Sequence, residues 1–293
     1  MRQGIYGCHP VVQLVFFAGA MGFGMCLLHP AFIAMGLLLA AAAVVCVTGR
    51  KGANMLPGLA AVLVAVTAVN PLFNPGGDSV LFTYFGRNFT LEALAYGGAA
   101  AAMFVTVLMW FACFNAVMTS DRLLYLFGAL APAVSLVLTM TLRLVPAYQR
   151  KTASIRMARR CVGLAPESGS RRHRLVRSMD ILSALTGWAL EGGIITADAM
   201  AGRGYGSAKR TRFSLFRFTW RDGAALGVLL LLAGGVIAGI LGGGLQAAYQ
   251  PGFDVAWNGF TLMGGIAYAL FLAAPTILYA EEVITWRILR RKI

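Results

Sequence analysis

Long apolar runs separated by short polar breaks set the pattern of the chain. Six such runs lie at 11–28, 31–48, 56–73, 93–115, 223–245 and 259–280. Each is about twenty residues long, which is the helix length needed to cross the hydrocarbon core of a bilayer. The pattern therefore predicts an all-α polytopic membrane protein with about six transmembrane helices.

The breaks between these runs differ in length. His29-Pro30 and residues 49–52 are short, so the first three helices should form a tight hairpin series. The third helix should end within the NPLFNP segment, because proline lacks an N–H donor and disfavours helix before it. Residues 76–92 and 246–258 are expected to be polar loops. The first run is long enough to span a bilayer, so we interpret it as an uncleaved helix and not as a signal peptide.

The middle of the chain has a different pattern. Between Met118 and Asp222 lie 17 Lys and Arg residues and six acidic residues, together with shorter apolar runs. Helix-start and helix-stop signals predict three helices at about 120–131, 133–163 and 177–201, the second bent at Pro146. The chain is thus expected to divide into four N-terminal transmembrane helices (1–117), a cytoplasmic helical platform (118–222) and two C-terminal transmembrane helices with a basic tail (223–293).

The third of these helices is predicted to be amphipathic. Its acidic residues recur at spacings of 11 and 7, which return to nearly the same helical angle, and its apolar residues cluster on the adjoining face. The acidic stripe is Asp180, Glu191 and Asp198, and the apolar face is Ile181, Leu185, Trp188 and Ile195.

Composition and charge place the chain in the membrane. It is 59% hydrophobic and only 12% charged, yet its net charge is +14. In a membrane protein Lys and Arg report topology before they report ligands. With both termini in the cytoplasm, every Lys and Arg except Arg87 falls on the cytoplasmic side or in the central platform. We therefore expect both termini to be cytoplasmic, and a mostly embedded chain argues against a nucleic-acid partner.

The motifs of catalysis and of metal binding are missing. The five cysteines show no C-x-x-C spacing and there are only three histidines, which argues against a disulfide framework or a metal site. The chain contains no G-x-x-x-x-G-K-[ST], H-E-x-x-H or G-x-S-x-G motif, which argues against a nucleotide site or a catalytic site of these classes. The apolar runs contain hardly any ionisable residue, and Asn70 and Asn115 lie near helix ends. This disfavours a self-contained transporter.

Glycines recur every four residues in the fifth apolar run, at Gly235, Gly239 and Gly243. Small residues at this spacing allow two helices to approach closely in a membrane. We favour packing inside the helix bundle over an interface with a partner.

The segment AMAGRGYGSAKRTRF, residues 199–213, combines glycines with cations. A phosphate-binding loop would need a strand before its glycines, whereas here a predicted helix precedes them. The cations Lys209, Arg210 and Arg212 are expected to contact anionic lipid headgroups beside the fifth span. Arg203 lies between Gly202 and Gly204, small neighbours that would let its guanidinium pair with a carboxylate on a partner surface.

These segments resemble the T component of energy-coupling factor (ECF) transporters. ITADAMAGRGYGSAKRTRF is similar to the family's Ala-Met-Glu-Ala-Arg-Gly-Tyr-Gly pattern with its basic Arg-Thr continuation. LRLVPAYQRKTASIRMARRCVG is similar to the Leu-Arg-Phe-Ile-Pro helix that leads to the family's first Ala-Arg-Gly-type motif, and NPLFNPGG also fits. The layout agrees over the whole chain, and the sequence agrees over about 120–213.

The resemblance implies a non-enzymatic coupling subunit, with no cofactor of its own, of an importer in a prokaryotic inner or plasma membrane. Its partners would be two cytoplasmic ABC ATPases, which bind the ATP and Mg²⁺, and a membrane S component that binds a vitamin or a metal ion. Membrane lipids would surround it. Two alternatives stay open: a self-contained membrane transporter or channel, and a membrane-embedded enzyme that acts on lipid.

The family's two ATPase-docking motifs can be placed on this sequence. The second motif falls on Gly202, Arg203 and Gly204, with Ala201 where the family commonly has Glu. For the first motif, alignment on Ala158 and Gly163 puts Cys161-Val162-Gly163 where Ala-Arg-Gly is expected, so the arginine is missing. Alternatively Ala158-Arg159-Arg160 is a shifted motif, in which Arg159 or Arg160 supplies the contact. In either case the two ATPase contacts would differ chemically.

Overall fold

The computed structural model describes residues 7–73, 80–84, 87–164, 170–207, 216–243 and 259–290. The chain forms two compact units. Residues Met1–Leu123 and Phe216–Ile293 make up one of them, here called the membrane unit, and Leu124–Leu215 make up the other, here called the insert.

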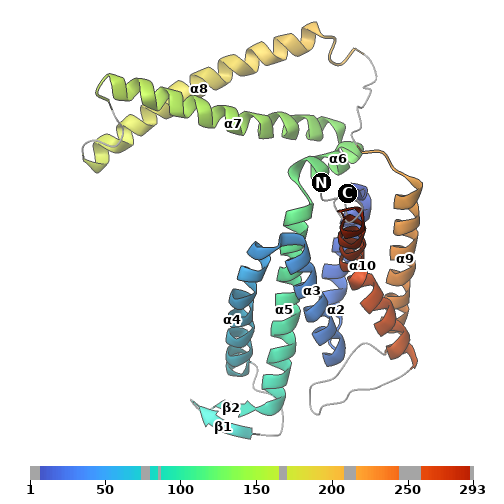
Figure 1. Cartoon of the computed structure of the whole chain (residues 1–293). Helices are drawn as coiled ribbons and strands as arrows, with labels where there is room; N and C mark the ends of the chain where they lie inside the picture. The colour runs from blue at the N-terminus through green and yellow to red at the C-terminus, as the bar shows by residue number, and fades with distance from the viewer. Residues whose placement is uncertain are drawn as a thin grey trace. The chain divides into compact units, whose positions relative to one another are not determined.

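Long helices that run alternately in opposite directions build the membrane unit (Figure 1). They are α2 (Pro10–Cys26), α3 (Pro30–Thr48), α4 (Arg50–Phe73), α5 (Leu91–Val117), α9 (Trp220–Leu241) and α10 (Gly259–Arg290). Among the described residues, all of these except α2 are long and apolar enough to cross a membrane. Helix α2 is apolar but has 17 residues, which span about 25 Å at 1.5 Å per residue. The chain is thus a multi-span helical membrane protein, with five spans supported by length where the sequence predicts six.

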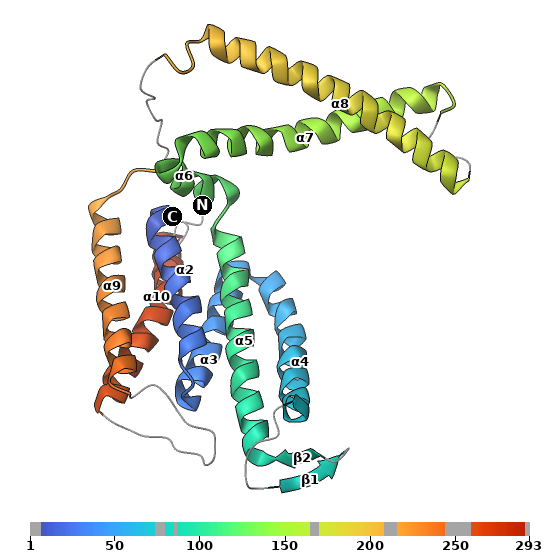
Figure 2. The same ribbon diagram turned by 180° about the vertical axis from the view of Figure 1, so that it is seen from behind.

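A β-hairpin stands where the sequence predicts only a polar loop. Strand β1 (Val80–Tyr84) pairs antiparallel with β2 (Arg87–Thr90), and the register joins Phe82 to Phe89 and Tyr84 to Arg87. In the described part of the chain the fold is otherwise all-α as predicted, and it is the interpretation of this stretch as a loop that is wrong. The two short stretches are rich in β-branched and aromatic residues, which favour extended pairing. Both views place the hairpin next to the first turn of α5 (Figures 1 and 2).

Two of the helices start with the same His-Pro pair. His9 and His29 are the N-caps of α2 and α3, and the Nδ1 atom of each accepts a hydrogen bond from the backbone N–H two residues later, at 3.3 Å. The proline that follows occupies the first helical position, where no N–H is needed. Between α3 and α4 the expected break of four residues shrinks to Gly49 alone, whose φ of 65° turns the chain.

The core of the membrane unit is aromatic and lies between α2, α5 and α10. Phe16 packs edge-on against Trp110 at 5.5 Å between ring centroids and stacks on Phe271 at 5.4 Å. Trp110 is fully buried. Glycines bring the helices close: a Cβ atom on Gly19 would lie 2.6 Å from the ring of Phe271. Packing of this kind holds helices together in a membrane, where burial of apolar surface from water contributes little.

The insert consists mainly of two long helices, and the preceding helix leads into it. Helix α6 (Ser120–Leu130) starts in the membrane unit, α7 spans Pro132–Cys161 and α8 spans Arg171–Gly202. All three predicted helices are present, but α8 begins about two turns earlier than expected, and α7 continues as helix through Pro146. The two long helices cross each other (Figures 1 and 2). Among the described residues of α7 and α8, only Ile181 is buried.

Candidate functional site

The end of α8 is a tight glycine-terminated turn that displays Arg203. Arg203 is the C-cap residue, and Gly204 after it has a φ of 75°. The turn is closed by two backbone hydrogen bonds, from Tyr205 N–H to Met200 O at 3.0 Å and from Gly204 N–H to Ala201 O at 2.9 Å. This pair of bonds defines the Schellman cap, in which glycine adopts the left-handed conformation at low cost.

The end of α7 has the same cap. Val162 is the C-cap residue, and Gly163 has a φ of 75°. The two closing hydrogen bonds run from Leu164 N–H to Arg159 O at 2.9 Å and from Gly163 N–H to Arg160 O at 3.1 Å. The two helix ends therefore have the same backbone geometry. In the sequence, the only sign of this relation is a glycine just after each helix, Gly163 and Gly204.

Because the two caps have the same geometry, the residues of one can be matched with those of the other. Val162 occupies the C-cap position that Arg203 occupies in α8, and Leu164 corresponds to Tyr205. The side chain of Val162 is 74% exposed and that of Tyr205 is 52% exposed. One helix end thus displays a cation beside a phenol, whereas the other displays two aliphatic side chains.

The two arginines considered for the first motif lie one turn before this cap. Arg159 Nη2 forms an ion pair with Asp180 Oδ2 at 2.7 Å, and Arg159 Nη1 donates to Arg177 O at 3.2 Å. Arg159 is therefore engaged with α8. Arg160 and Ala158 are exposed.

The glycines around Arg203 play different parts. Gly204 is required by its positive φ, so its main role is to end the helix. A Cβ atom added at Gly202 would meet nothing within 4 Å. Gly202 therefore leaves open space next to Arg203.

The apolar side chains of α8 form two faces. The predicted face is partly shielded by α7: Ile181 is buried, and Trp188 packs edge-on against Tyr148 at 5.7 Å, with Lys151 Nζ 5.4 Å from its ring centroid. Ile195 is exposed. The second face was not predicted and is exposed to solvent: Leu175, Met179, Leu182 and Leu190.

Helix α7 also carries an exposed apolar stripe, along its first half. Residues at i, i+3, i+4, i+8 and i+11 share one face of a helix. Here they are Val134, Val137, Leu138, Leu142 and Val145, and each is at least 41% exposed. A sequence pattern can show such a stripe but not whether it is covered. Contiguous apolar surface of this kind marks an interaction site.

The remaining predicted residues lie in several places. Gly235 faces α10, where an added Cβ atom would lie 3.1 Å from Ala267 Cβ, and Gly239 is buried. Gly243 lies beyond the end of α9, with a φ of 70°, and so stands outside the helical ladder. The predicted lipid-contacting residues Lys209, Arg210 and Arg212 lie outside the described residues.

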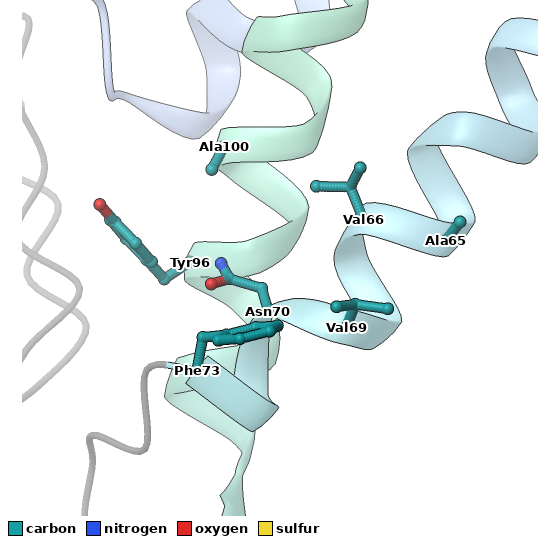
Figure 3. Close-up of a pocket in the computed structure, with 7 residues that line it drawn as sticks. All are labelled: Ala65, Val66, Val69, Asn70, Phe73, Tyr96 and Ala100. Atoms are coloured by element: carbon teal, nitrogen blue, oxygen red, sulfur yellow. The ribbon is translucent and has the colours of Figure 1, made fainter.

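A shallow pocket of about 490 Å³ lies between α4 and α5 (Figure 3). Asn70 and Tyr96 supply its polar groups, and Phe73 lies at one edge. Asn70 belongs to the last turn of α4, so the pocket is near the end of a span and not at its midpoint. Among the described residues, no group of three His, Cys, Asp or Glu side chains could hold a metal ion.

No protein-family model matches this sequence, and no curated protein matches it. The functional assignment therefore depends on the geometry and on the motifs themselves.

Proposed function

We propose that this protein is the transmembrane T component of an energy-coupling factor importer. It would link ATP hydrolysis by two ABC ATPases to an S component that carries a vitamin or a metal ion. The observation that carries the proposal is the matched pair of caps that end α7 and α8, one of them displaying Arg203 beside open space. Two equivalent docking points on one chain suit a pair of related partner subunits.

The two halves of α7 differ in composition, which supports a different contact for each half. Its first half carries the exposed stripe Val134–Val145 and no charge before Arg143, whereas its second half carries five cations. An apolar stripe suits contact with a membrane-embedded S component, and a basic helix end suits an acidic groove on an ATPase. ATP and Mg²⁺ belong to those partners.

The two docking contacts would be unequal. At α8, the guanidinium of Arg203 would pair with a carboxylate of the ATPase. At α7, Val162 and Leu164 would make an apolar contact, with exposed Arg160 beside it. Arg159 would stay bound to Asp180 and keep the two helices aligned.

In this mechanism, ATP-driven closure of the ATPases moves the ends of α7 and α8. The movement shifts the apolar stripe on α7, and the S component tilts and releases its substrate on the cytoplasmic side. Such a chain would sit in a prokaryotic cell membrane with both termini in the cytoplasm, as the distribution of Lys and Arg predicts.

Affinity purification of the full chain in mild detergent tests the proposal. Two ABC ATPase chains and one small membrane protein should be recovered with it. Arg203→Glu should remove the ATPases from the preparation, while Arg217→Glu, an exposed cation of the membrane unit, should retain them. Recovery of the chain alone, with uptake of solutes by the purified chain in liposomes, would instead establish a self-contained transporter.

A further inference from the structure

The two points where the chain leaves and re-enters the membrane unit are both tied to the start of α2. The chain leaves after Leu123 and returns at Phe216. Just before the exit, Arg122 Nη1 donates to Gln13 Oε1 at 2.8 Å, across 109 residues of sequence. Just after the return, Asp222 Oδ1 accepts from the backbone N–H of His9 at 2.8 Å, across 213 residues. We call His9, Gln13, Arg122 and Asp222 the root cluster.

Three members of the root cluster, His9, Gln13 and Asp222, are buried, and Arg122 is partly buried. Gln13 is 2% exposed and Asp222 is 8% exposed. Gln13 uses both ends of its amide, because Nε2 donates to Cys8 O at 3.0 Å while Oε1 accepts from Arg122. Asp222 uses both oxygens, because Oδ2 accepts from the N–H of Thr219 at 3.0 Å and from its hydroxyl at 2.6 Å. A buried polar group without such partners would be strongly unfavourable.

Asp222 makes one hydrogen bond more than the capping of α9 requires. Thr219 and Asp222 already form a capping box at the start of α9, and that box occupies only Oδ2. The second oxygen reaches a different helix. Ring contacts support the same junction, since Phe218 packs edge-on against His9 at 5.2 Å and Arg122 lies 6.0 Å from the ring centroid of Phe216. Burial lowers the pKa of the His9 imidazole, although the Asp222 carboxylate acts in the opposite direction. The shift favours the neutral ring whose Nδ1 caps α2.

We infer that the first turn of α2 is the element through which movement of the insert reaches the core of the membrane unit. His9, Gln13, Arg122 and Asp222 are positioning residues in this transmission. The inference rests on the proposed function, because it assumes that partners move the insert. Both connections between the insert and the membrane unit are bonded to the start of α2. A movement of either connection would therefore displace that helix end. The next turns of α2 carry Phe16 and Phe17, which pack against Trp110 at the centre of the core.

A pair of substitutions at His9 isolates the hydrogen bond from the His9 N–H to Asp222. The backbone φ of His9 is −59°, which proline can adopt. His9→Ala removes the imidazole but keeps the N–H that Asp222 accepts, whereas His9→Pro removes the imidazole and the N–H. The difference between these two variants therefore reports the contact between α2 and α9. Thr219→Val is the control for the capping box, because it removes one bond to Oδ2 and leaves Oδ1 bound to His9.

The exposed thiol of Cys26, the last residue of α2, serves as the reporter. In the complex purified with its ATPases, with the other cysteines replaced by serine or alanine, the rate of maleimide labelling at Cys26 is measured without nucleotide. It is measured again with Mg²⁺ and a non-hydrolysable ATP analogue. We expect the two rates to differ about fivefold, in the range of a typical coupling energy. The difference should persist in His9→Ala and Thr219→Val, and should vanish in His9→Pro.

A second arm keeps the inference testable if His9→Pro fails to fold. Gln13→Leu removes the acceptor for Arg122, whereas Gln13→Glu keeps an acceptor and adds a complementary charge. The nucleotide-dependent difference at Cys26 should vanish in Gln13→Leu and persist in Gln13→Glu.

The possible failures are separable. If no ATPase is recovered with the chain, the proposed function fails. If the ATPases are recovered but labelling of Cys26 is the same with and without nucleotide, or the difference survives in both His9→Pro and Gln13→Leu, the proposed function stands and the inference about α2 is wrong. Equal loss of the difference in His9→Ala and His9→Pro, or in Gln13→Glu and Gln13→Leu, would assign these residues a purely structural role.

Discussion

The membrane unit and the insert bury their side chains to very different extents. In the membrane unit, aromatic rings from α2, α5 and α10 meet around the fully buried Trp110. In the insert, α7 and α8 touch at their crossing, and Ile181 is the one described residue of these two helices that is buried. The membrane unit therefore has a packed core of its own, whereas the insert leaves most of its apolar surface exposed.

The same substitution in both units tests this contrast and has the largest expected effect. Trp110→Ala should destabilise the membrane unit by about 3–5 kcal/mol, because it leaves a cavity in a packed core. Trp188→Ala removes a partly exposed ring that touches only Tyr148 and Lys151 in the described contacts, and should destabilise by about 1 kcal/mol or less. Thermal reaction of the buried Cys113 with a thiol-reactive dye in detergent measures the first effect. An equal shift of the Cys113 transition in Trp188→Ala would show that the two units unfold together.

The two helix ends offer a second comparison, with a smaller expected effect. Arg203→Val gives the end of α8 the C-cap residue of α7, and should weaken ATPase binding by about 1.5–3 kcal/mol through loss of a charge-assisted hydrogen bond. Val162→Arg makes the reverse change at α7, and should leave binding at α8 intact. If the proposed function holds, titration of the detergent-purified chain with the two ABC ATPases gives both affinities. Equal losses in the two variants would mean that the ends are not chemically distinct docking points.

Substitution of the cap glycines should have a smaller effect than substitution of the side chains that the caps display. Gly163→Ala and Gly204→Ala each place a Cβ atom at a φ of 75°, which costs about 1–2 kcal/mol. Because the strain frays the last turn of a helix and not the core, far-UV circular dichroism should show a small loss of helix with no change at Cys113. Gly187→Ala, in the middle of α8 where an added Cβ atom meets nothing within 4 Å, should instead increase helix content.

The smallest effect is expected at the ion pair between α7 and α8. The side chains of Arg159 and Asp180 are 23% and 49% exposed, so water and salt screen their attraction. A double-mutant cycle with Arg159→Gln and Asp180→Asn should give a coupling energy of about 0.2–1 kcal/mol that decreases as salt is added. A coupling energy above this range, or one insensitive to salt, would show that the ion pair is shielded from water.

The sequence predicts the long helices of both units because their signals are local. Apolar runs of spanning length, the His-Pro starts and the glycines after α7 and α8 each act within a few residues. The sequence does not predict the hairpin of β1 and β2, because its strands are only five and four residues long and stand in a connection between two spans. The four-residue break at 49–52 was overestimated, since a single positive φ at Gly49 suffices to reverse the chain.

The candidate site was predicted in part. Arg203 and its glycines stand out in the sequence, but the separate roles of Gly202 and Gly204 depend on backbone angles. The engagement of Arg159 by Asp180 requires α7 and α8 to cross, which no local pattern encodes. The root cluster joins residues 109 and 213 positions apart, and a lone Gln13 in an apolar run gives no sign of its partner.

The shared cap of α7 and α8 separates the shape of a helix end from the chemistry that it displays. Backbone hydrogen bonds and one glycine set the shape, and the preceding residue points outward without contributing to it. A substitution at Val162 or Arg203 therefore changes the displayed side chain while the helix end keeps its form. The two helix ends can differ from each other without any change in the backbone that carries them.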